Sequence, residues 1–344
     1  MAKADDINGL DCGGDVAAGM VLVLRTRLAE MCALRAAALD WSDPEGVHDM
    51  RVASRRLRSA VRDFAPYLRG RLPGKRLRLL ADALGAVRDA DVALIALADL
   101  GREAEPEIDA GLRLLVTERC RQREEVRALL ELVLEEAALA ALQEKFLRRL
   151  ARVSDKPAAG ARHRDRGDAL SFRDAGREIA LARLAELLAE GRAIYRPHAE
   201  RRLHRLRIAA KRLRYALELF APCWGEQLTA AAGEVAELQK SLGELHDCDV
   251  WIAELGARLE RLPTRADQSE LREGAADMRR AAVWLLERFV KERGKHYRAA
   301  LTRWEDWLAM DFCQHLNASF QHTDFADQPA DMPADSPSTD LGES

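Results

Sequence analysis

Hydrophobic residues recur at helical spacing along most of this chain of 344 residues, and the clearest stretch runs from Val47 to Pro66. At about 100° per residue, its charged and apolar positions fall on opposite sides of a helix. The charged side holds His48, Arg51, Arg55, Arg58 and Arg62. The apolar side holds Met50, Ala53, Leu57, Ala60, Val61 and Phe64. The pattern predicts an amphipathic helix whose polar side is a row of cations.

The pattern returns between Leu203 and Pro222, where ten of twenty positions are identical to those of the first stretch. The second row consists of His204, Arg207, Lys211 and Arg214, in register with the first. Glu218 stands where the first row has Arg62, so the second row is one position shorter. Arg56 and Arg212 lie beside the main arc, where they can flank a ligand or pair with acids.

Further helices are predicted around the two cationic stretches, in the same order each time. The ranges with helical periodicity are 15–39, 77–100, 107–152, 172–190, 227–242, 254–262 and 268–312. The sequence Ser42-Asp43-Pro44-Glu45 has the spacing of a helix start, and Pro66 and Pro222 close the cationic helices. Residues 1–14 read as a flexible N-terminus, 153–170 as a linker and 317–344 as a disordered acidic tail.

The recurring order predicts an all-α fold with two tandem, duplicated bundles of the four-helix type. The first repeat covers 15–152 and the second 171–316, and a pseudo-two-fold axis is expected to relate them. Ala, Leu, Arg and Glu dominate the composition and only 5% of residues are aromatic, which favours helices over sheet.

The formal net charge of −3 conceals an uneven distribution of charge. The tail carries six acidic residues and no Lys or Arg, and residues 1–14 are also acidic, so the remaining body is basic. Only eight of the 54 basic residues are Lys. The planar donor fork of Arg suits phosphate, although GC-rich codon usage explains the bias equally well. The placement of the cations therefore carries more weight than their number, and it points to an anionic partner.

Neighbouring cations within each row repel one another, at about 0.2–0.5 kcal/mol per pair and on the order of 1 kcal/mol for the first row. Acids from adjacent helices can offset this cost, with Asp49, Asp89 and Asp91 as candidates. An anionic ligand is the alternative. The span from His48 to Arg62 is roughly 21 Å on a helix, which suits an extended polyanion.

The two histidines allow two interpretations. A single histidine on a helix is most often a packed or hydrogen-bonded residue. Because His48 and His204 each begin a cationic row, the favoured interpretation is that both donate hydrogen bonds to phosphate. A nearby polyanion would favour the protonated imidazole, so binding is expected to tighten as the pH falls towards 6.

Carboxylate chemistry is the main alternative to simple binding. The pairs Asp89/Asp91 and Asp247/Asp249 could suggest Mg²⁺ ligands, but positions two apart on a helix point about 200° from each other. Pairing with Arg or helix capping is therefore preferred. The dipeptide His246-Asp247 resembles that of metal-dependent phosphohydrolases, yet the first repeat has Arg88 at the position matching His246. No Gly-rich phosphate loop, GxSxG or HExxH motif occurs, so no catalytic residue, metal or cofactor is expected.

The cysteines are scattered, at positions 12, 32, 120, 223, 248 and 313, without a CxxC pair. We interpret most of them as small apolar residues of a protein in a reducing, cytosolic setting. No apolar run reaches the length of a membrane-spanning helix, and a secretory signal is not expected.

The paired motifs resemble those of the CHAD family, the conserved histidine α-helical domain. The first set is His48-x-x-Arg51-x-x-x-Arg55-Arg56-Leu57-Arg58 with Leu84-Gly85-x-x-x-Asp89-x-Asp91. The second set is His204-x-x-Arg207-x-x-x-Lys211-Arg212-Leu213-Arg214 with Leu242-Gly243-x-x-x-Asp247-x-Asp249. The resemblance covers about residues 15–312. Because no ExExK signature of a CYTH module is found, the chain is similar to stand-alone members of the family.

The resemblance implies two four-helix bundles with a basic central groove or pore that binds inorganic polyphosphate. It also implies a cytoplasmic protein, with association to polyphosphate granules as in some members. The site residues expected from the rows are His48, Arg51, Arg55, Arg56, Arg58, Arg62, His204, Arg207, Lys211, Arg212 and Arg214. The leading hypothesis is non-catalytic polyphosphate binding. The alternatives are a metal-dependent phosphohydrolase that uses Asp89, Asp247 and His246, or a nucleic-acid binder that contacts only the phosphate backbone.

Overall fold

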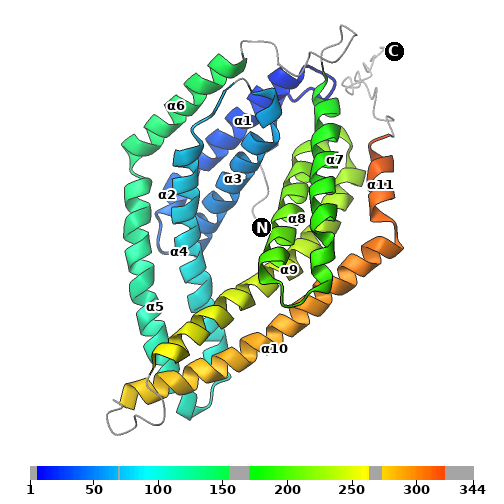
Figure 1. Cartoon of the computed structure of the whole chain (residues 1–344). Coiled ribbons are helices and arrows are strands. Elements are labelled where there is room, and N and C mark those ends of the chain that lie inside the picture. Colours follow the sequence, from blue (N-terminus) through cyan, green and yellow to red (C-terminus); the bar gives the residue numbers. More distant parts are fainter. Residues whose placement is uncertain (1–5, 69, 155–169, 263–272, 322–344) are drawn as a thin grey trace, which may run out of the picture.

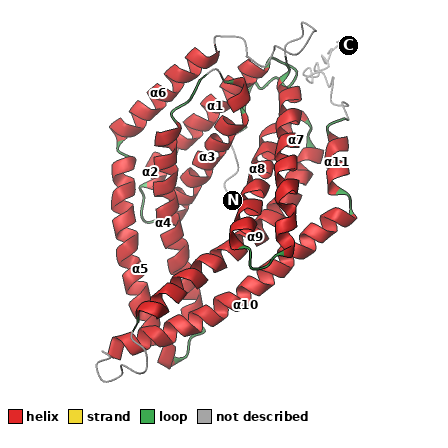
Figure 2. Ribbon diagram, viewed as in Figure 1, coloured by secondary structure: helices red, strands yellow, loops and turns green. Residues whose placement is uncertain are grey.

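The computed structural model describes residues 6–68, 70–154, 170–262 and 273–321, and this part of the chain contains helices and no strand (Figures 1 and 2). The all-α prediction is confirmed. The α-helices are α1 (Val16–Ala33), α2 (Arg35–Ala38), α3 (Pro44–Asp63), α4 (Gly74–Gly101), α5 (Pro106–Val133), α6 (Glu136–Ser154), α7 (Phe172–Glu190), α8 (Glu200–Phe220), α9 (Glu226–Arg261), α10 (Glu273–Ala309) and α11 (Phe312–Ser319). Short 3-10 helices follow three of them, namely η1 (Ala65–Tyr67), η3 (Gly191–Tyr195) and η4 (Ala221–Cys223).

The first cationic helix, α3, begins where the sequence places its cap. The Asp43 carboxylate accepts a hydrogen bond of 2.9 Å from the backbone N–H of Glu45, and Pro44 occupies the first helical position. The α-helix ends at Asp63 and a 3-10 turn containing Pro66 follows it. Proline cannot continue the hydrogen-bond ladder, which explains the stop. The second cationic helix, α8, ends in the same way at η4.

The main hydrophobic core draws buried residues from both halves of the chain. At its centre three phenylalanine rings join the ends of α3 and α8 to the start of α7. Phe64 lies 6.0 Å from Phe172 and 5.9 Å from Phe220, and the last two are 5.1 Å apart between ring centroids. The two predicted repeats therefore share one core. The element order recurs, while the pseudo-two-fold axis stays a prediction.

A second, smaller core lies at the far end of the long helices α4, α5, α9 and α10, low in Figure 1. Its buried residues are Leu97, Leu112, Leu115, Leu255, Ala281, Ala282 and Leu285. The rings of Trp251 and Phe289 stack beside them at 4.9 Å. The ranges 227–242 and 254–262, predicted as separate stretches, are parts of the single helix α9. The two halves thus contact each other at both ends of the molecule.

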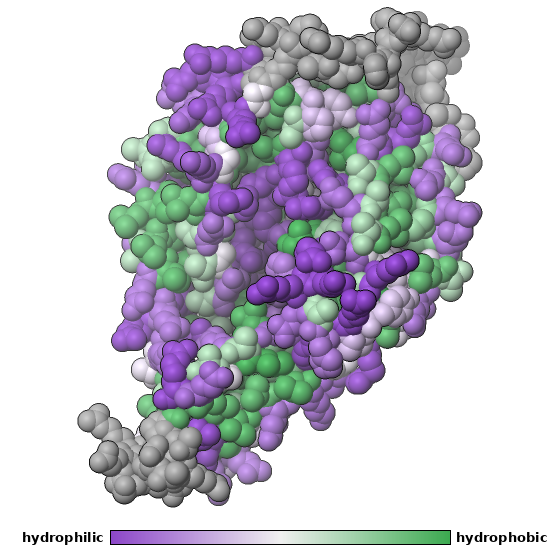
Figure 3. Space-filling view, viewed as in Figure 1, coloured by the Kyte–Doolittle hydropathy of each residue, from purple (hydrophilic) through white to green (hydrophobic). Residues whose placement is uncertain are grey.

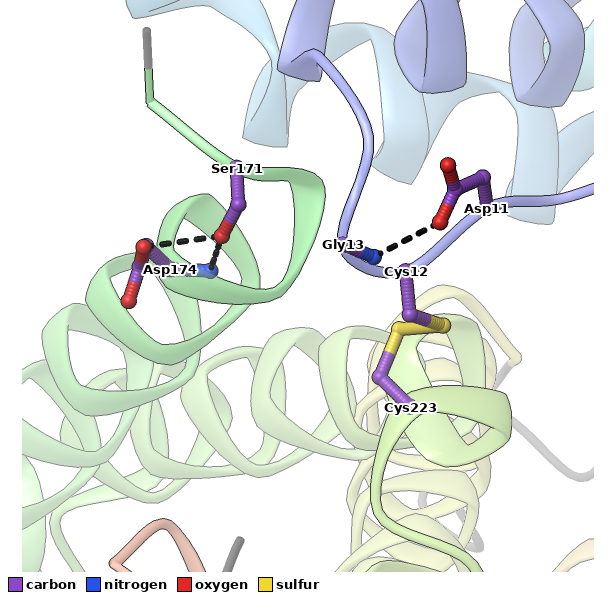
Figure 4. The surroundings of a disulfide bond; sticks show 6 residues. All are labelled: Asp11, Cys12, Gly13, Ser171, Asp174 and Cys223. Carbon is purple, nitrogen blue, oxygen red and sulfur yellow. Dashed lines mark hydrogen bonds between the residues drawn. A yellow bond between two sulfur atoms is a disulfide. The ribbon is translucent and has the colours of Figure 1, made fainter. Parts of the chain in front are cut away.

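The N-terminal segment differs from the flexible lead-in that its composition predicts. From residue 6 onward it packs against the core, and Cys12 forms a disulfide with Cys223 (Figure 4). Backbone hydrogen bonds of 2.8–2.9 Å run from Phe172 to Gly14 and from Arg173 to Cys12. The interpretation of the cysteines as unpaired apolar residues is wrong for this pair, because 211 residues separate its members and only the tertiary fold brings them together. The cysteines therefore give no support for a reducing compartment.

The C-terminal boundary also shifts. The acidic tail is predicted from residue 317, but α11 continues to Ser319 and the Phe320 ring packs edge-on against Trp224 at 5.0 Å. The rest of the tail, from residue 322, and linker residues 155–169 lie outside the described residues. Within the described part of the chain, no helix combines the length and apolar character that crossing a membrane requires.

Candidate functional site

The two cationic helices, α3 and α8, lie side by side between the halves of the molecule (Figure 1). Their rows face each other in register, so like charges meet across the contact. The cations that repel one another are Arg51 with Arg207, Arg55 and Arg58 with Lys211, and Arg62 with Arg212. The fold therefore brings together two charged faces that lie 156 residues apart in the sequence.

A recess of about 170 Å³ opens between these helices. Its lining consists of Arg55, Arg58, Ser59 and Arg62 from α3 and Ile208, Lys211, Arg212 and Tyr215 from α8. We call these residues, together with Arg51 and Arg207, the cationic groove. Figure 3 shows hydrophilic side chains lining a hollow in the middle of the molecule, between the two halves. The groove is thus accessible from solvent and polar on its walls.

Carboxylates neutralise only part of the groove. Arg51 forms an ion pair of 3.2 Å with Asp89, and Arg212 forms one of 3.2 Å with Glu186. Five other cations have no carboxylate within ion-pairing distance among the described residues: Arg55, Arg58, Arg62, Arg207 and Lys211. Among the described residues, the acids of neighbouring helices therefore supply only part of the counter-charge that the rows require.

Lys211 experiences this excess of charge most strongly. Burial, and to a smaller extent the adjacent Arg55 and Arg207, together lower the pKa of its amine to about 6. Burial also lowers the pKa of Arg55 and of Arg207. The Arg55 guanidinium lies 5.9 Å from the centre of the Tyr215 ring, whose face attracts a cation. Without an anion, the free groove holds a lysine that is mostly uncharged at neutral pH.

Two residues predicted for the site belong to an adjacent ion-pair cluster. Arg214 pairs with Glu218 at 3.2 Å, and Arg56 pairs with Glu30 at 3.5 Å. Glu30 also binds Arg27 at 2.8 Å. This cluster borders a second, smaller recess that Arg27, Arg56 and Glu218 line, and Arg214 is buried with 5% of its side chain exposed. The structure thus separates Arg56 and Arg214 from the unpaired cations of the groove.

His48 lies at the N-terminal end of the first row. Its Nδ1 is buried without a hydrogen-bond partner, and burial and the nearby Arg88 lower its pKa. The side chains of Glu45, His48 and Asp49 offer ligand atoms within 4.8 Å of one another. Glu45 is exposed and also forms an ion pair with Arg88 at 3.5 Å, so one of the two carboxylates of this cluster already has a cationic partner.

His204 occupies the matching end of the second row and packs against His246, with ring centroids 4.5 Å apart. Burial and the charge of Arg207 lower the pKa of His204. The pKa of His246 falls to about 4, chiefly through burial and then through Arg207. Both imidazoles are therefore neutral in the free protein near pH 7.

The Asp-x-Asp pairs point to different partners, as expected for structural carboxylates. Asp89 binds Arg51, whereas Asp91 lies 3.7 Å from Arg127 on α5. In the second half, Asp249 binds Arg293 on α10 at 2.5 Å. Asp247 lies near Arg207, and burial raises its pKa. The arrangement does not bring both carboxylates of a pair to one point.

Tyr215, like Ser59 and Ile208, is a groove residue that the sequence pattern does not single out. It is buried and carries Arg55 on one side and Arg214 on the other, at 5.9 and 5.0 Å. Ser59 and Tyr215 line both recesses, so they form the partition between the groove and the ion-pair cluster. The periodicity of one helix cannot show this role, because it depends on the residues of the facing helix.

Comparison with known proteins fits this arrangement. The CHAD domain family matches residues 22–256, which is most of the chain. The chain belongs to the CHAD domain family. The crystal structure of the CHAD domain from the plant Ricinus communis superimposes with a TM-score of 0.66 at 23% identity, covering 87% of this chain and 95% of that one.

PptA from Streptomyces chartreusis is a second structure with this CHAD fold, with a TM-score of 0.58 at 15% identity. The match covers 85% of this chain and 100% of that one. At these identities the likeness establishes the fold alone. The comparison with curated proteins gives no match.

Proposed function

We propose that this CHAD protein binds inorganic polyphosphate in the cationic groove and does not cleave it. The observation that carries the proposal is the set of five groove cations without a carboxylate partner among the described residues. Bringing such charges together opposes folding unless a ligand compensates for it. The groove is therefore suited to an anion that the described residues do not supply.

Polyphosphate has the chemistry that this groove requires. Each of its phosphoryl units offers oxygens that accept hydrogen bonds, and Arg can bind them with two parallel donors. The row from Arg51 to Arg62 is roughly 16 Å long at 1.5 Å per residue, and the second row runs beside it. A linear polyanion lying between the rows would contact both along this length, which a single phosphate ester is too short to do.

The way in which the carboxylates are held supports a non-catalytic role. Hydrolysis of a phosphoanhydride by metal ions needs carboxylates that converge on the metal. Here Asp89 and Asp249 are bound to arginines. We expect no release of phosphate from polyphosphate when Mg²⁺ or Mn²⁺ is added. Release that an Asp247→Asn variant abolishes would instead establish the phosphohydrolase alternative.

Nucleic acid fits the site less well than polyphosphate. Single-stranded nucleic acid is usually bound with bases stacked on exposed aromatic rings. The one aromatic ring of the groove, Tyr215, is buried between two guanidinium groups. In a competition assay at equal phosphate and salt concentrations, polyphosphate is expected to displace DNA.

The decisive variant removes two unpaired cations, one from each row. Arg55→Ala together with Lys211→Ala is expected to weaken binding of long-chain polyphosphate by about 100-fold or more, because charge-assisted hydrogen bonds contribute roughly 1.5–3 kcal/mol each. The change is measured by calorimetric titration at physiological salt.

A matched control removes two basic residues at positions outside the groove. Arg201 and Arg202 are exposed on α8, outside the groove, and replacing both with Ala likewise removes two basic side chains. This control should bind almost as tightly as the unmodified protein. Equal weakening of both double variants would contradict the proposal, because it would show that only overall charge matters.

Cytoplasmic localisation on polyphosphate granules is part of the same proposal. Its support is the family resemblance together with the unpaired cations of the groove. A fluorescently tagged chain is expected to collect on granules, and the Arg55→Ala/Lys211→Ala variant is expected to stay diffuse.

A further inference from the structure

A second group of cations lies apart from the cationic groove, where the segment before α4 meets α6. It surrounds a cavity of about 450 Å³. The lining residues are Arg71, Leu72, Pro73, Gly74, Lys75, Arg76, Lys145 and Arg149. We call this cavity the α4–α6 pocket. It shares no residue with the groove, and strongly hydrophilic side chains gather over this corner of the molecule in Figure 3.

The five cations of the α4–α6 pocket have no carboxylate partner among the described residues. Arg148, their neighbour on α6, shows the contrast because it binds Glu144 at 3.0 Å. The Arg149 guanidinium donates instead to the backbone carbonyl of Arg71, at 3.2 Å. This hydrogen bond ties α6 to the opposite wall of the pocket and leaves the positive charge uncompensated.

The walls of the pocket are fixed to the main core. Leu72 and Leu77 are buried on the α4 side, and Phe146 and Leu150 are buried on the α6 side. The cations alternate with these anchors along the chain, so their backbone positions are set by packing. Lys145 and Arg149 are half-buried, which removes part of the water that would otherwise screen them.

The charges of the pocket repel one another. Lys145 and Arg149 are four residues apart on α6, a spacing that opposes the helix by about 0.2–0.5 kcal/mol. Lys75 and Arg76 lie in the first turn of α4, which contains no acidic residue. The positive end of that helix adds to the same side of the pocket. A multivalent anion would relieve all of these repulsions together.

We propose that the α4–α6 pocket is a second anion site, which takes a compact oligophosphate of two or three phosphoryl groups. Its volume lies in the range of small-molecule sites. Arg71 and Arg149 can each bind phosphate oxygens with two donors, and the two lysines supply point charges around them. The site is distinct from the groove, so the protein holds a short oligophosphate and a long chain at separate places.

The test uses tripolyphosphate and the Arg55→Ala/Lys211→Ala background, in which the groove is disabled. This background is expected to keep binding tripolyphosphate in calorimetric titrations at physiological salt. Adding Lys145→Ala and Arg149→Ala should weaken that binding by about 100-fold. Lys75→Ala with Arg76→Ala, which changes only exposed residues, should give a similar loss.

The matched control is Arg148→Ala with Arg152→Ala, which removes two exposed cations from the same helix outside the pocket. It should leave the affinity for tripolyphosphate almost unchanged. The proposal is overturned if the control weakens binding as much as the pocket variants do. It is also overturned if the groove variant alone abolishes tripolyphosphate binding. Long-chain polyphosphate binding by the unmodified protein and the groove variant tests the groove separately.

Discussion

Lys211 is the residue whose protonation is expected to change most when an anion binds in the groove. In the free protein its amine is mostly neutral near pH 7, because burial and surrounding arginines lower its pKa to about 6. A phosphate chain in the groove would reverse the electrostatic part of this effect and raise the pKa. His48 and His204 respond in the same direction, since burial lowers the pKa of both in the free protein. Binding of an anion should therefore be coupled to the uptake of protons.

This coupling predicts that the affinity for polyphosphate depends on pH, and that Lys211→Met takes up fewer protons on binding than the unmodified protein. Between pH 8 and pH 6, polyphosphate should bind more tightly as the pH falls. At high pH, part of the binding free energy is used to protonate the Lys211 amine, and at low pH the amine is already protonated. Titrations at pH 8 in two buffers of different ionisation enthalpy measure the protons taken up. Lys211→Met should take up fewer protons than the unmodified protein. Equal uptake by the two proteins would contradict the assignment.

At the residue scale, the sequence identifies cations that line the groove, but it does not show which residues lie at or beyond the edge of the groove. Helical spacing places Arg55 and Lys211 at matching positions of the two rows, and in the structure both line the groove. It also includes Arg214, which the structure pairs with Glu218 behind the partition. Tyr215 is missed for the opposite reason, since its role depends on Arg55 from the facing helix. The Arg214–Glu218 pair lies within α8 at a spacing of four residues, so the sequence contained a signal for it, whereas the contact between Tyr215 and Arg55 cannot be read from one helix alone.

At the scale of the elements, two glycines allow helices and aromatic rings to approach closely. A Cβ at Gly19 on α1 would lie 2.3 Å from the Phe172 ring, and one at Gly176 on α7 would lie 2.6 Å from the Phe220 ring. These contacts hold the ends of α3 and α8 against the shared core, and so they position both cationic rows. The helical period predicts the elements and their caps, but it contains no information about such approaches between them.

Gly176→Ala is expected to destabilise the protein by about 1–3 kcal/mol, because the added methyl group overlaps the buried Phe220 ring. The free energy of unfolding is measured by urea denaturation. Gly233→Ala on α9 is the matched control, since a Cβ there meets no atom within 4 Å. Alanine lowers the entropy of the unfolded chain, so the control should be stabilised by roughly 0.5–1 kcal/mol. Similar stability of the two variants would contradict the packing assigned to Gly176.

At the scale of the whole molecule, the two halves are joined more firmly than the idea of tandem bundles suggests. They share the main core, meet again at the far end of the long helices, and are linked by the Cys12–Cys223 disulfide. The sequence predicts the all-α class and the recurring order of the helices, because both can be read from the local spacing of apolar residues. It does not predict the joint core or the disulfide, because these depend on contacts between residues far apart in the chain.

The disulfide is expected to contribute about 2–5 kcal/mol to the free energy of unfolding, the usual cost of removing a native disulfide. Cys12→Ser with Cys223→Ser, or the unmodified protein in reductant, should therefore unfold at a lower denaturant concentration. Both should still bind polyphosphate, since neither cysteine lines the groove. Unchanged stability in reductant would show that the bond does not contribute.

The most direct test of the cationic groove is a crystal structure of the protein with long-chain polyphosphate bound. We predict consecutive phosphoryl groups between α3 and α8, with oxygens about 2.7–2.9 Å from the side-chain nitrogens of Arg55, Arg207 and Lys211. Phosphate density confined to the outer surface, with these three side chains uncontacted, would contradict it.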